Sequence, residues 1–224
     1  MKWYVIKIPK WIKMLFPKRL WSFSEKENVL YLTFDDGPIP GVTPWVLEQL
    51  KQYNAKATFF CIGKNVEENP GVFKQLLAEG HSVGNHTHNH LNASKYSNKE
   101  YLDNVQKAQK VIQDWEIENT KISNRQSSTV NQKLFRPPYG KLSSKKAKAL
   151  LDLNYQIVMW EVLSADFDTT ISKEKCLKNV LNNAKSGSII IFHDSIKAGD
   201  KLRYVLPRVL THYTEKGYTF KAIS

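Results

Sequence analysis

The chain is poor in cysteine: Cys61 and Cys176 are the only two among 224 residues. Cys61 ends an apolar run and Cys176 lies on a predicted helix, so we expect both to be small residues of the core. Two cysteines placed in this way exclude a disulfide framework and a cysteine-rich zinc cluster. They are compatible with a reducing compartment but do not require one.

Residues 1–24 contain no acidic residue and no long uncharged run. Their uncharged segments are too short for a signal-peptide core or a membrane span, which predicts a cytoplasmic chain or one bound peripherally to a membrane. Six bases supply half of the net charge of +12, and aromatic residues are interleaved with them. The bases are Lys2, Lys7, Lys10, Lys13, Lys18 and Arg19, and the aromatic residues are Trp3, Tyr4, Trp11, Phe16, Trp21 and Phe23.

Two interpretations of this segment stay open. Bases combined with tryptophan suit the head-group layer of an anionic membrane, so residues 1–24 could be an interfacial anchor. The simpler interpretation is an arm whose aromatic side chains pack on the domain, with Pro9 and Pro17 interrupting any long helix. Positive charge would also attract nucleic acid, but no nucleic-acid-binding motif accompanies it, and we expect no nucleic-acid partner.

No glycine-rich phosphate loop follows any predicted strand, which argues against nucleotide binding. Instead, predicted strands and helices alternate from residue 29 onward. The expected strands are 29–34, 57–62, 81–85, 134–135, 155–162, 188–192 and 218–223. The expected helices are 43–53, 70–79, 98–115, 143–152, 172–185 and 201–216, and a polar surface insertion is expected over 118–133.

This alternation predicts an α/β fold with a parallel sheet and helices outside it. The number of units favours a distorted (β/α) barrel of about seven to eight strands, with the active site at the C-terminal strand ends. The length suits one domain. We therefore divide the chain into a basic, aromatic N-terminal arm over residues 1–27 and a single domain over residues 28–224.

Two adjacent carboxylates, Asp35 and Asp36, follow the first predicted strand, and Gly37-Pro38 then breaks it. Neighbouring residues of a strand point to opposite sides, so one carboxylate could hold a cation while the other handles a proton. The plainer interpretation is a turn in which the Asp side chains accept backbone N–H bonds.

Three histidines, His86, His88 and His90, follow another predicted strand end. His86 and His90 are four residues apart and can face one way on a helical turn, whereas His88 would point elsewhere. Two histidines and one carboxylate form a ligand set for a divalent metal ion, with a position left open for water. A histidine pair alone is often incidental, but the Asp pair at a second strand end favours metal binding.

The sequence resembles the polysaccharide deacetylases of carbohydrate esterase family four, which share the nodulation-factor deacetylase homology domain. The similarity covers about residues 28–223, and four motifs in the family's order make it specific. The motifs are Thr33-Phe34-Asp35-Asp36-Gly37, the pair His86 and His90, Arg136-Pro137-Pro138-Tyr139-Gly140, and Ser188-Ile189-Ile190-Ile191-Phe192-His193-Asp194.

A further motif departs from the family's pattern, in which two Asp three residues apart precede a Trp. Here Leu163 and Phe167 replace one Asp and the Trp, and Asp166 is retained. We expect the loss of the Trp to alter the shape of the sugar pocket more than the chemistry.

By this resemblance, Asp36, His86 and His90 hold a divalent metal ion. Zn²⁺ is the first choice, and Co²⁺ or another divalent ion is an alternative. The domain over residues 28–224 is then a catalytic domain.

The resemblance also implies an acid–base set. Asp35 is the general base, and Arg136 pairs with it and keeps it ionised. The backbone N–H of Tyr139 stabilises the tetrahedral oxyanion. His193 protonates the leaving amine, and Asp166 favours the charged form of His193.

The implied function is metal-dependent hydrolysis of N-acetyl groups on amino-sugar polymers or oligomers, of the chitooligosaccharide or peptidoglycan type. The partner is then a carbohydrate substrate, with a possible contact between residues 1–24 and an anionic membrane. An O-acetyl esterase on acetylated polysaccharide is the enzymatic alternative. A catalytically silent carbohydrate-binding protein of the same fold is the other alternative, although the intact motif residues argue against it. The oligomeric state does not follow from the sequence.

Overall fold

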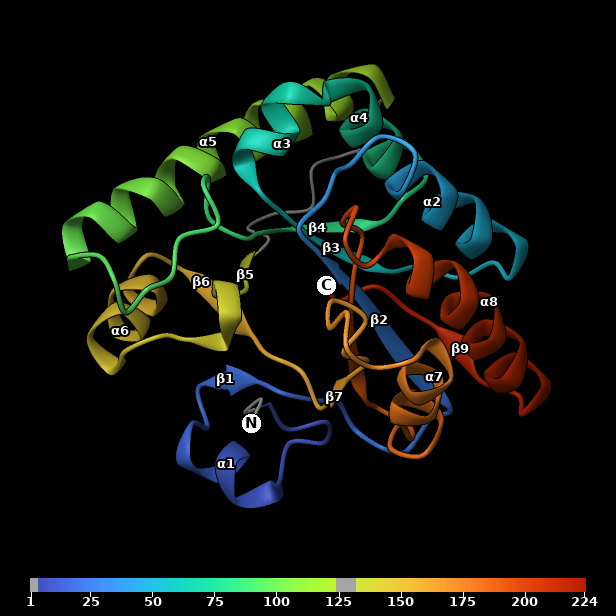
Figure 1. Cartoon of the computed structure of the whole chain (residues 1–224). Coiled ribbons are helices and arrows are strands. Elements are labelled where there is room, and N and C mark those ends of the chain that lie inside the picture. Colours follow the sequence, from blue (N-terminus) through green and yellow to red (C-terminus); the bar gives the residue numbers. More distant parts are fainter. Residues whose placement is uncertain (1–3, 124–131) are drawn as a thin grey trace.

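The computed structural model describes residues 4–123 and 132–224. In these residues eight parallel strands form one curled sheet in the order β1-β6-β5-β4-β3-β2-β8-β7, and β9 pairs with β2 (Figure 1). The strands are β1 (Arg19–Leu20), β2 (Val29–Asp35), β3 (Thr58–Cys61), β4 (Ser82–Asn85), β5 (Lys133–Phe135), β6 (Tyr155–Val158), β7 (Val162–Leu163), β8 (Ile189–His193) and β9 (Thr219–Phe220). The expected distorted α/β barrel is confirmed.

Helices cover the outer side of this sheet (Figure 1). They are α1 (Lys10–Leu15), α2 (Thr43–Gln52), α3 (Gly63–Glu68), α4 (Pro70–Ala78), α5 (Asn98–Ser123), α6 (Ser144–Asp152), α7 (Lys173–Leu181) and α8 (Gly199–Glu215), with a 3-10 turn over Pro138–Gly140. Since β2 and β8 lie inside the sheet, they read as nearly continuous apolar runs. Phe34 stacks on Phe59 and Phe192, with ring centroids 5.0 and 5.8 Å away. All three rings belong to the main hydrophobic core.

The strand expected over 155–162 is in fact two strands. β6 pairs with β5 and β1, whereas β7 pairs with β8 at the far end of the sheet. Residues 159–161 cross between them. At the start of this crossing, the Arg136 guanidinium donates hydrogen bonds to the carbonyls of Val158 and Met159. The apolar sequence 155–162 does not reveal this break, because both halves are buried.

Two helical segments also differ from expectation. α5 continues to Ser123, so residues 118–123 of the insertion expected over 118–133 are helical instead. Residues 124–131 of that insertion lie outside the described residues, and its last residue, Lys133, begins β5. The short α3 was not expected, because only Gly63 and Val66 of its six residues are buried and no apolar period marks it.

The described part of the N-terminal arm packs on the domain. β1 extends the sheet beside β6, and Lys7 forms an antiparallel bridge with Val162. Trp21 is buried, and Lys13 donates a hydrogen bond to the buried carboxylate of Glu161. The domain boundary after residue 27 stays a prediction, but the described arm is continuous with the sheet.

Two further expectations concern the whole chain. Cys61 and Cys176 are buried and free, as expected. Within the described ranges, every helix is too short or too polar to cross a lipid bilayer.

The hydrogen-bonded ion pair between Lys13 and Glu161 should contribute to the free energy of unfolding. Burial raises the pKa of Glu161, but hydrogen bonds from Lys13 and Ser188 outweigh this effect and leave the pKa below its ordinary value. Lys13→Met leaves a buried charge without its partner, and we expect it to lower the free energy of unfolding by about 3 kcal/mol at neutral pH. Denaturant titration measures this change.

The matched control is Lys10→Met on the same helix, whose side chain is exposed and which should change stability little. A carboxylate whose pKa is lowered on folding stabilises the protein above its ordinary pKa, and this contribution is lost as the pH falls through the lowered value. The penalty of Lys13→Met should therefore shrink in acid. Equal effects of the two variants would contradict the role of the buried pair.

Candidate active site

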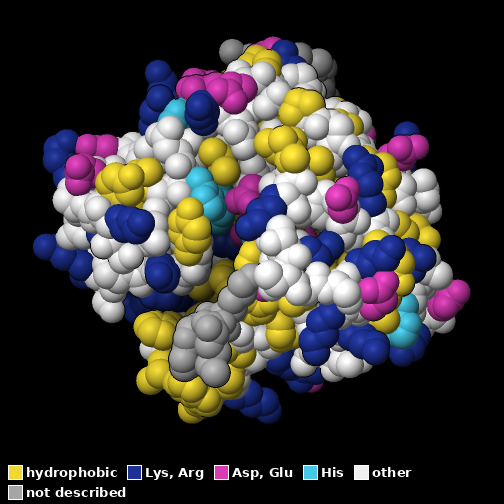
Figure 2. All heavy atoms as spheres, viewed as in Figure 1, with side chains coloured by type: hydrophobic (Ala, Val, Ile, Leu, Met, Phe, Trp, Pro, Cys, Tyr) yellow, Lys and Arg dark blue, Asp and Glu magenta, His cyan; other side chains and the backbone are white. Residues whose placement is uncertain are grey.

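The three predicted metal ligands converge at the C-terminal ends of β2 and β4. One ligand atom from each of Asp36, His86 and His90 lies within 4.8 Å of the others. Asp36 Oδ1 is 3.3 Å from Nε2 of His90 and 3.7 Å from Nε2 of His86. In Figure 2, His and acidic side chains lie together near the centre of the face shown.

The histidines reach this geometry through a loop and not through the helical turn expected from their spacing. Thr87 and His90 have φ of 65° and 54°, in the left-handed region. The Asn85 side chain fixes the loop, because its Oδ1 accepts the Thr87 N–H at 2.8 Å and its Nδ2 donates to the Val105 carbonyl. The ring of His88 turns away, with Nε2 3.5 Å from a Glu67 oxygen.

The state of His86 suits a metal ligand. Its Nδ1 lies 2.8 Å from the Arg136 carbonyl, so Nδ1 carries the proton and Nε2 presents its lone pair toward Asp36. Burial lowers the pKa of His86 to about 4, which keeps the ring neutral at physiological pH.

The environment of Asp36 also fits a cation. Its Oδ1 is buried and receives no hydrogen bond from the described residues. A buried carboxylate oxygen without a donor is costly unless a cation satisfies it. One carboxylate and two imidazoles form a donor set that divalent transition metals accept, so the three residues could hold such an ion.

The neighbouring carboxylate, Asp35, has a different partner. Its Oδ1 accepts a hydrogen bond of 2.7 Å from Arg136 Nη1, and both side chains are buried. The same Nη1 also donates to Thr33 Oγ1 at 2.7 Å, and the guanidinium lies over the Phe60 ring. Burial lowers the pKa of Arg136, while Asp35 opposes this effect. Asp35 is thus held by Arg136, and Asp36 faces the histidines.

On the other side of β2, His193 ends β8 in direct register with Asp35. Its Nδ1 lies 2.7 Å from Asp166 Oδ1, and its backbone N–H donates to the other Asp166 oxygen at 2.8 Å. Burial disfavours the charged ring, but the carboxylates, Asp166 foremost, outweigh it and raise the pKa of His193 to about 9. His193 is therefore protonated at neutral pH and can donate a proton from Nε2.

Tyr139 lies across the pocket beside the histidines. It adopts φ of 60° within the turn Pro138–Gly140, and its ring centroid is 4.7 Å from that of His90. Its side chain is mostly exposed, and the residue lines the pocket. The part proposed for its N–H stays a prediction.

Sequence reasoning assigned no role to Asp194, which the structure places in the same cluster. Its carboxylate accepts the Gly37 N–H at 3.0 Å and the Thr43 hydroxyl at 2.5 Å. Burial raises the pKa of Asp194 to about 7. A side chain at Gly37 would collide with this carboxylate, so Asp194 and the absence of a Cβ together set the loop that carries Asp36. The sequence signal that could have identified Asp194 is its position directly after His193.

A pocket of about 420 Å³ is lined by Asp35, Asp36, His86, His90, Tyr139 and His193. One wall is apolar and includes Leu163 and Phe167 of the altered motif; the Phe167 ring meets the His193 ring edge to face at 5.0 Å. Two other wall residues were not expected, namely Tyr4 from the arm and Trp160 from the crossing after β6. The indole N–H of Trp160 is buried and has no hydrogen-bond partner in the described part of the chain.

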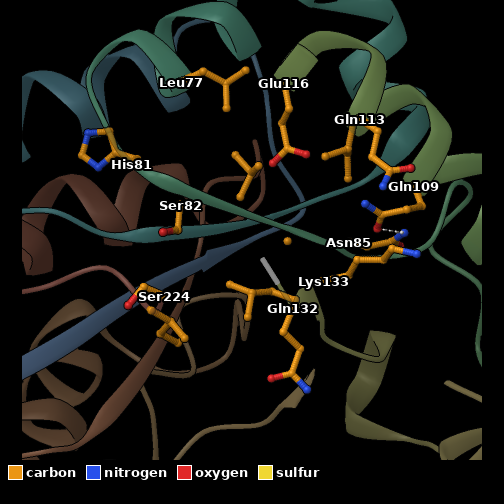
Figure 3. A pocket seen from close by; sticks show the side chains of 15 residues that line it. Leu77, His81, Ser82, Asn85, Gln109, Gln113, Glu116, Gln132, Lys133 and Ser224 are labelled. Carbon is orange, nitrogen blue, oxygen red and sulfur yellow. Dashed lines mark hydrogen bonds between the residues drawn. The ribbon is translucent and has the colours of Figure 1, made fainter. Parts of the chain in front are cut away.

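A second pocket, of about 280 Å³, is polar and lies elsewhere (Figure 3). Its walls include Ser82 and Lys133, the first residues of β4 and β5, together with Gln109 and Glu116 of α5. None of the predicted site residues lines it. It lies at the N-terminal ends of the strands, whereas barrel enzymes carry their chemistry at the C-terminal ends.

Comparison with known proteins agrees with this geometry. The polysaccharide deacetylase family profile matches residues 24–158. The chain belongs to the polysaccharide deacetylase family. A peptidoglycan-N-acetylglucosamine deacetylase of Bacillus cereus is 36% identical over 205 residues, covering 91% of this chain and 90% of the relative. A chitooligosaccharide deacetylase of Azorhizobium caulinodans is 34% identical over 171 residues, covering 76% of each chain.

Solved structures of family members share the fold. A peptidoglycan N-acetylglucosamine deacetylase in complex with a hydroxamic acid superposes with a TM-score of 0.76 at 31% identity, covering 92% of this chain and 91% of the other. A family pseudoenzyme from Bacillus anthracis superposes with a TM-score of 0.74 at 25% identity, covering 91% and 66%. The fold alone therefore does not establish activity, and the site residues have to carry that argument.

The ligand set predicts a specific pattern of metal affinity. We expect Asp36→Asn, His86→Gln and His90→Gln each to weaken Zn²⁺ or Co²⁺ binding by at least about 100-fold, because outer-shell changes alone cost up to that much. Calorimetric titration of the purified protein measures this. His88→Gln is the matched control and should bind the ion like the wild type; equal losses at all three histidines would reject the set.

The pair His193–Asp166 predicts an unusual titration. In the metal-free protein we expect the His193 ring to lose its proton near pH 9, observed by NMR of the histidine side chains. Asp166→Asn removes the main charge that favours the protonated ring and should lower the midpoint by about one unit or more. Asp114→Asn, at an exposed carboxylate of α5, is the control and should leave it unchanged. A wild-type midpoint at the ordinary histidine value would contradict the assignment.

Proposed function

We propose that this chain is a metal-dependent deacetylase that hydrolyses N-acetyl groups of amino-sugar polymers or oligomers, of peptidoglycan or chitooligosaccharide type. The observation that carries the proposal is the division of the two adjacent carboxylates. Asp35 pairs with Arg136, and Asp36 faces His86 and His90. Named relatives of the chain are deacetylases of these two substrate types.

The metal ion is proposed to be Zn²⁺, held by Asp36, His86 and His90. When bound, it would polarise the acetamide carbonyl and lower the pKa of a bound water. Two imidazoles and a carboxylate, with a position left open, are typical of catalytic zinc sites. Co²⁺ and other divalent ions fit the same donors.

The remaining residues perform the proton transfers. Asp35 accepts the proton of the attacking water, and its ion pair with Arg136 orients it toward the pocket. The Tyr139 N–H donates to the oxyanion that develops on the acetyl carbonyl oxygen. His193 then gives a proton to the leaving amine nitrogen, so that acetate and the free amine form. Asp166 orients His193 and favours its charged form.

Two other functions remain as alternatives. An O-acetyl esterase would use the same attack on the acetyl carbonyl carbon. Its alkoxide leaves with less need of a proton than the amide nitrogen does. A silent carbohydrate-binding protein would need no general acid, and the protonated His193 beside Asp166 argues against it. The fully buried Arg136 would also be a costly feature of a silent site.

We further propose that residues 1–24 contact an anionic membrane and that the chain is cytoplasmic or peripheral to that membrane. The support is the excess of bases over acids in this segment. No nucleic-acid partner is proposed.

The decisive experiment measures acetate release and metal content on the same samples. We expect Asp35→Asn to retain the metal and to lose about 10²–10⁴ in rate, because Asn cannot accept the water proton. Asp36→Asn should lose both metal and activity. Asp114→Asn, on the exposed face of α5, is the control carboxylate and should do neither.

Chitooligosaccharides, peptidoglycan and acetylated xylan are compared in parallel. His193→Ala should impair amide hydrolysis more than ester hydrolysis, because the amine needs a proton in order to leave. Amide turnover by metal-loaded Asp35→Asn at the wild-type rate would show that Asp35 is not the base. Acetate release from the xylan alone would favour the esterase.

A further inference from the structure

The arm presents an apolar surface to solvent. It consists of four side chains on and just after α1, which we call the arm patch: Trp11, Met14, Leu15 and Phe16. Their exposed fractions are 61%, 78%, 63% and 38%. Figure 2 shows hydrophobic side chains gathered at the lower edge of the molecule, over α1. Soluble monomers rarely leave such a group of large apolar side chains together in water.

The patch is held firmly and is not a loose end. Ile12 of α1 packs against the hydrophobic cluster that contains Trp21. Trp11, Met14 and Leu15 are spaced by three and four residues and therefore share another face of the helix. Lys13 bonds to Glu161, and the Trp21 indole donates to the Phe16 carbonyl at 3.2 Å. Contacts with the domain therefore hold the inner face of α1 in place. Packing within the chain does not explain why its outer face is apolar.

Positive charge surrounds the patch. Lys10 and Lys18 are exposed at either end of α1. Arg19 lies over the Phe16 ring at 4.3 Å and donates to the Leu142 carbonyl. Residues 4–24 contain no acid. A large apolar face ringed by bases complements a surface that is anionic outside and apolar beneath.

The patch also lies near the active-site pocket. Tyr4 lines that pocket, and its hydroxyl donates to Asp168 at 2.7 Å. Six residue steps separate Tyr4 from Lys10, so the pocket wall and α1 are at most about 20 Å apart. Both lie on the face that Figure 2 shows. A surface that covered the patch would therefore lie close to the pocket mouth.

We propose that the arm patch is a membrane-docking surface, whose occupant is an anionic lipid bilayer. Trp11, Met14 and Leu15 enter the head-group boundary, and the surrounding bases contact lipid phosphates. A second copy of the chain is the poorer occupant, because it would bring the same basic ring against this one. If the proposed deacetylase function holds, on which this consequence rests, the substrate is an N-acetylated glycan held at the membrane surface.

The test uses the full chain and co-sedimentation with vesicles of phosphatidylglycerol and phosphatidylcholine. We expect wild-type binding to anionic vesicles, weaker binding as salt rises, and little binding to phosphatidylcholine alone. The double variant Trp11→Ser/Leu15→Ser should bind at least about tenfold more weakly. Lys10→Gln/Lys18→Gln should also weaken binding, by about fivefold for each charge near the surface.

The matched control is Ile117→Ser, an apolar side chain on α5 that is 54% exposed and distant from α1 in Figure 1. It should bind vesicles like the wild type. Absence of wild-type binding, or equal binding by Trp11→Ser/Leu15→Ser, overturns the proposal. A wild-type dimer that the double variant turns into a monomer, without vesicle binding, would identify a second copy as the occupant instead.

A second readout separates this proposal from the deacetylase function. Acetate release from a soluble chitooligosaccharide should be the same for the wild type and all these variants, because none of the changed residues lines the pocket. Vesicle binding without acetate release on any substrate would contradict the deacetylase function and support the membrane-docking surface. Acetate release without vesicle binding would support the deacetylase function and contradict the membrane-docking surface.

Discussion

The buried ion pair between Asp35 and Arg136 is the interaction on which the site depends. Arg136 is wholly buried, and its guanidinium bonds to Asp35, Thr33 and the carbonyls of Val158 and Met159. It thus ties β2 to the point where the chain leaves β6 and crosses toward β7. A buried charge is tolerated only when its donors are satisfied, and here the barrel's own crossing supplies two of the acceptors. One side chain therefore holds both the backbone at residues 158–159 and the carboxylate that faces the pocket.

Around this pair, two neighbouring residues acquire different chemistry from their surroundings. Asp35 has a permanent cation at its side, whereas Asp36 has two imidazoles and no hydrogen-bond donor among the described residues. On the other flank, Asp166 holds His193 in its charged form. A carboxylate paired with a guanidinium, Asp35, and an imidazole paired with a carboxylate, His193, therefore face one pocket. General acid–base chemistry needs such a pair, one group to accept a proton and one to donate it.

The arm joins this site to the molecular surface. Its inner side extends the sheet through β1 and places Tyr4 in the pocket wall, and its outer side carries the arm patch. The two interpretations of residues 1–24 are consequently not exclusive, because packing of Tyr4, Trp21 and Phe23 on the domain leaves Trp11 and Phe16 outside. The position of the arm patch near the pocket is a property of the fold.

Local patterns in the sequence determined the alternation of strands and helices, the strand-end position of Asp35 and His193, and the motifs that place the chain in its family. These features need only residues close in the chain, since burial period and turn residues act locally. Contacts between distant segments decided the rest. The break at residues 159–161 depends on Arg136 and on strand pairing at both ends of the sheet. The loop of His86 and His90 depends on the Asn85 side chain and α5, and Tyr4 reaches the pocket only because the arm pairs with Val162. Such positions are set by packing and hydrogen bonds across the fold, and residues far apart in the sequence carry no local sign of them.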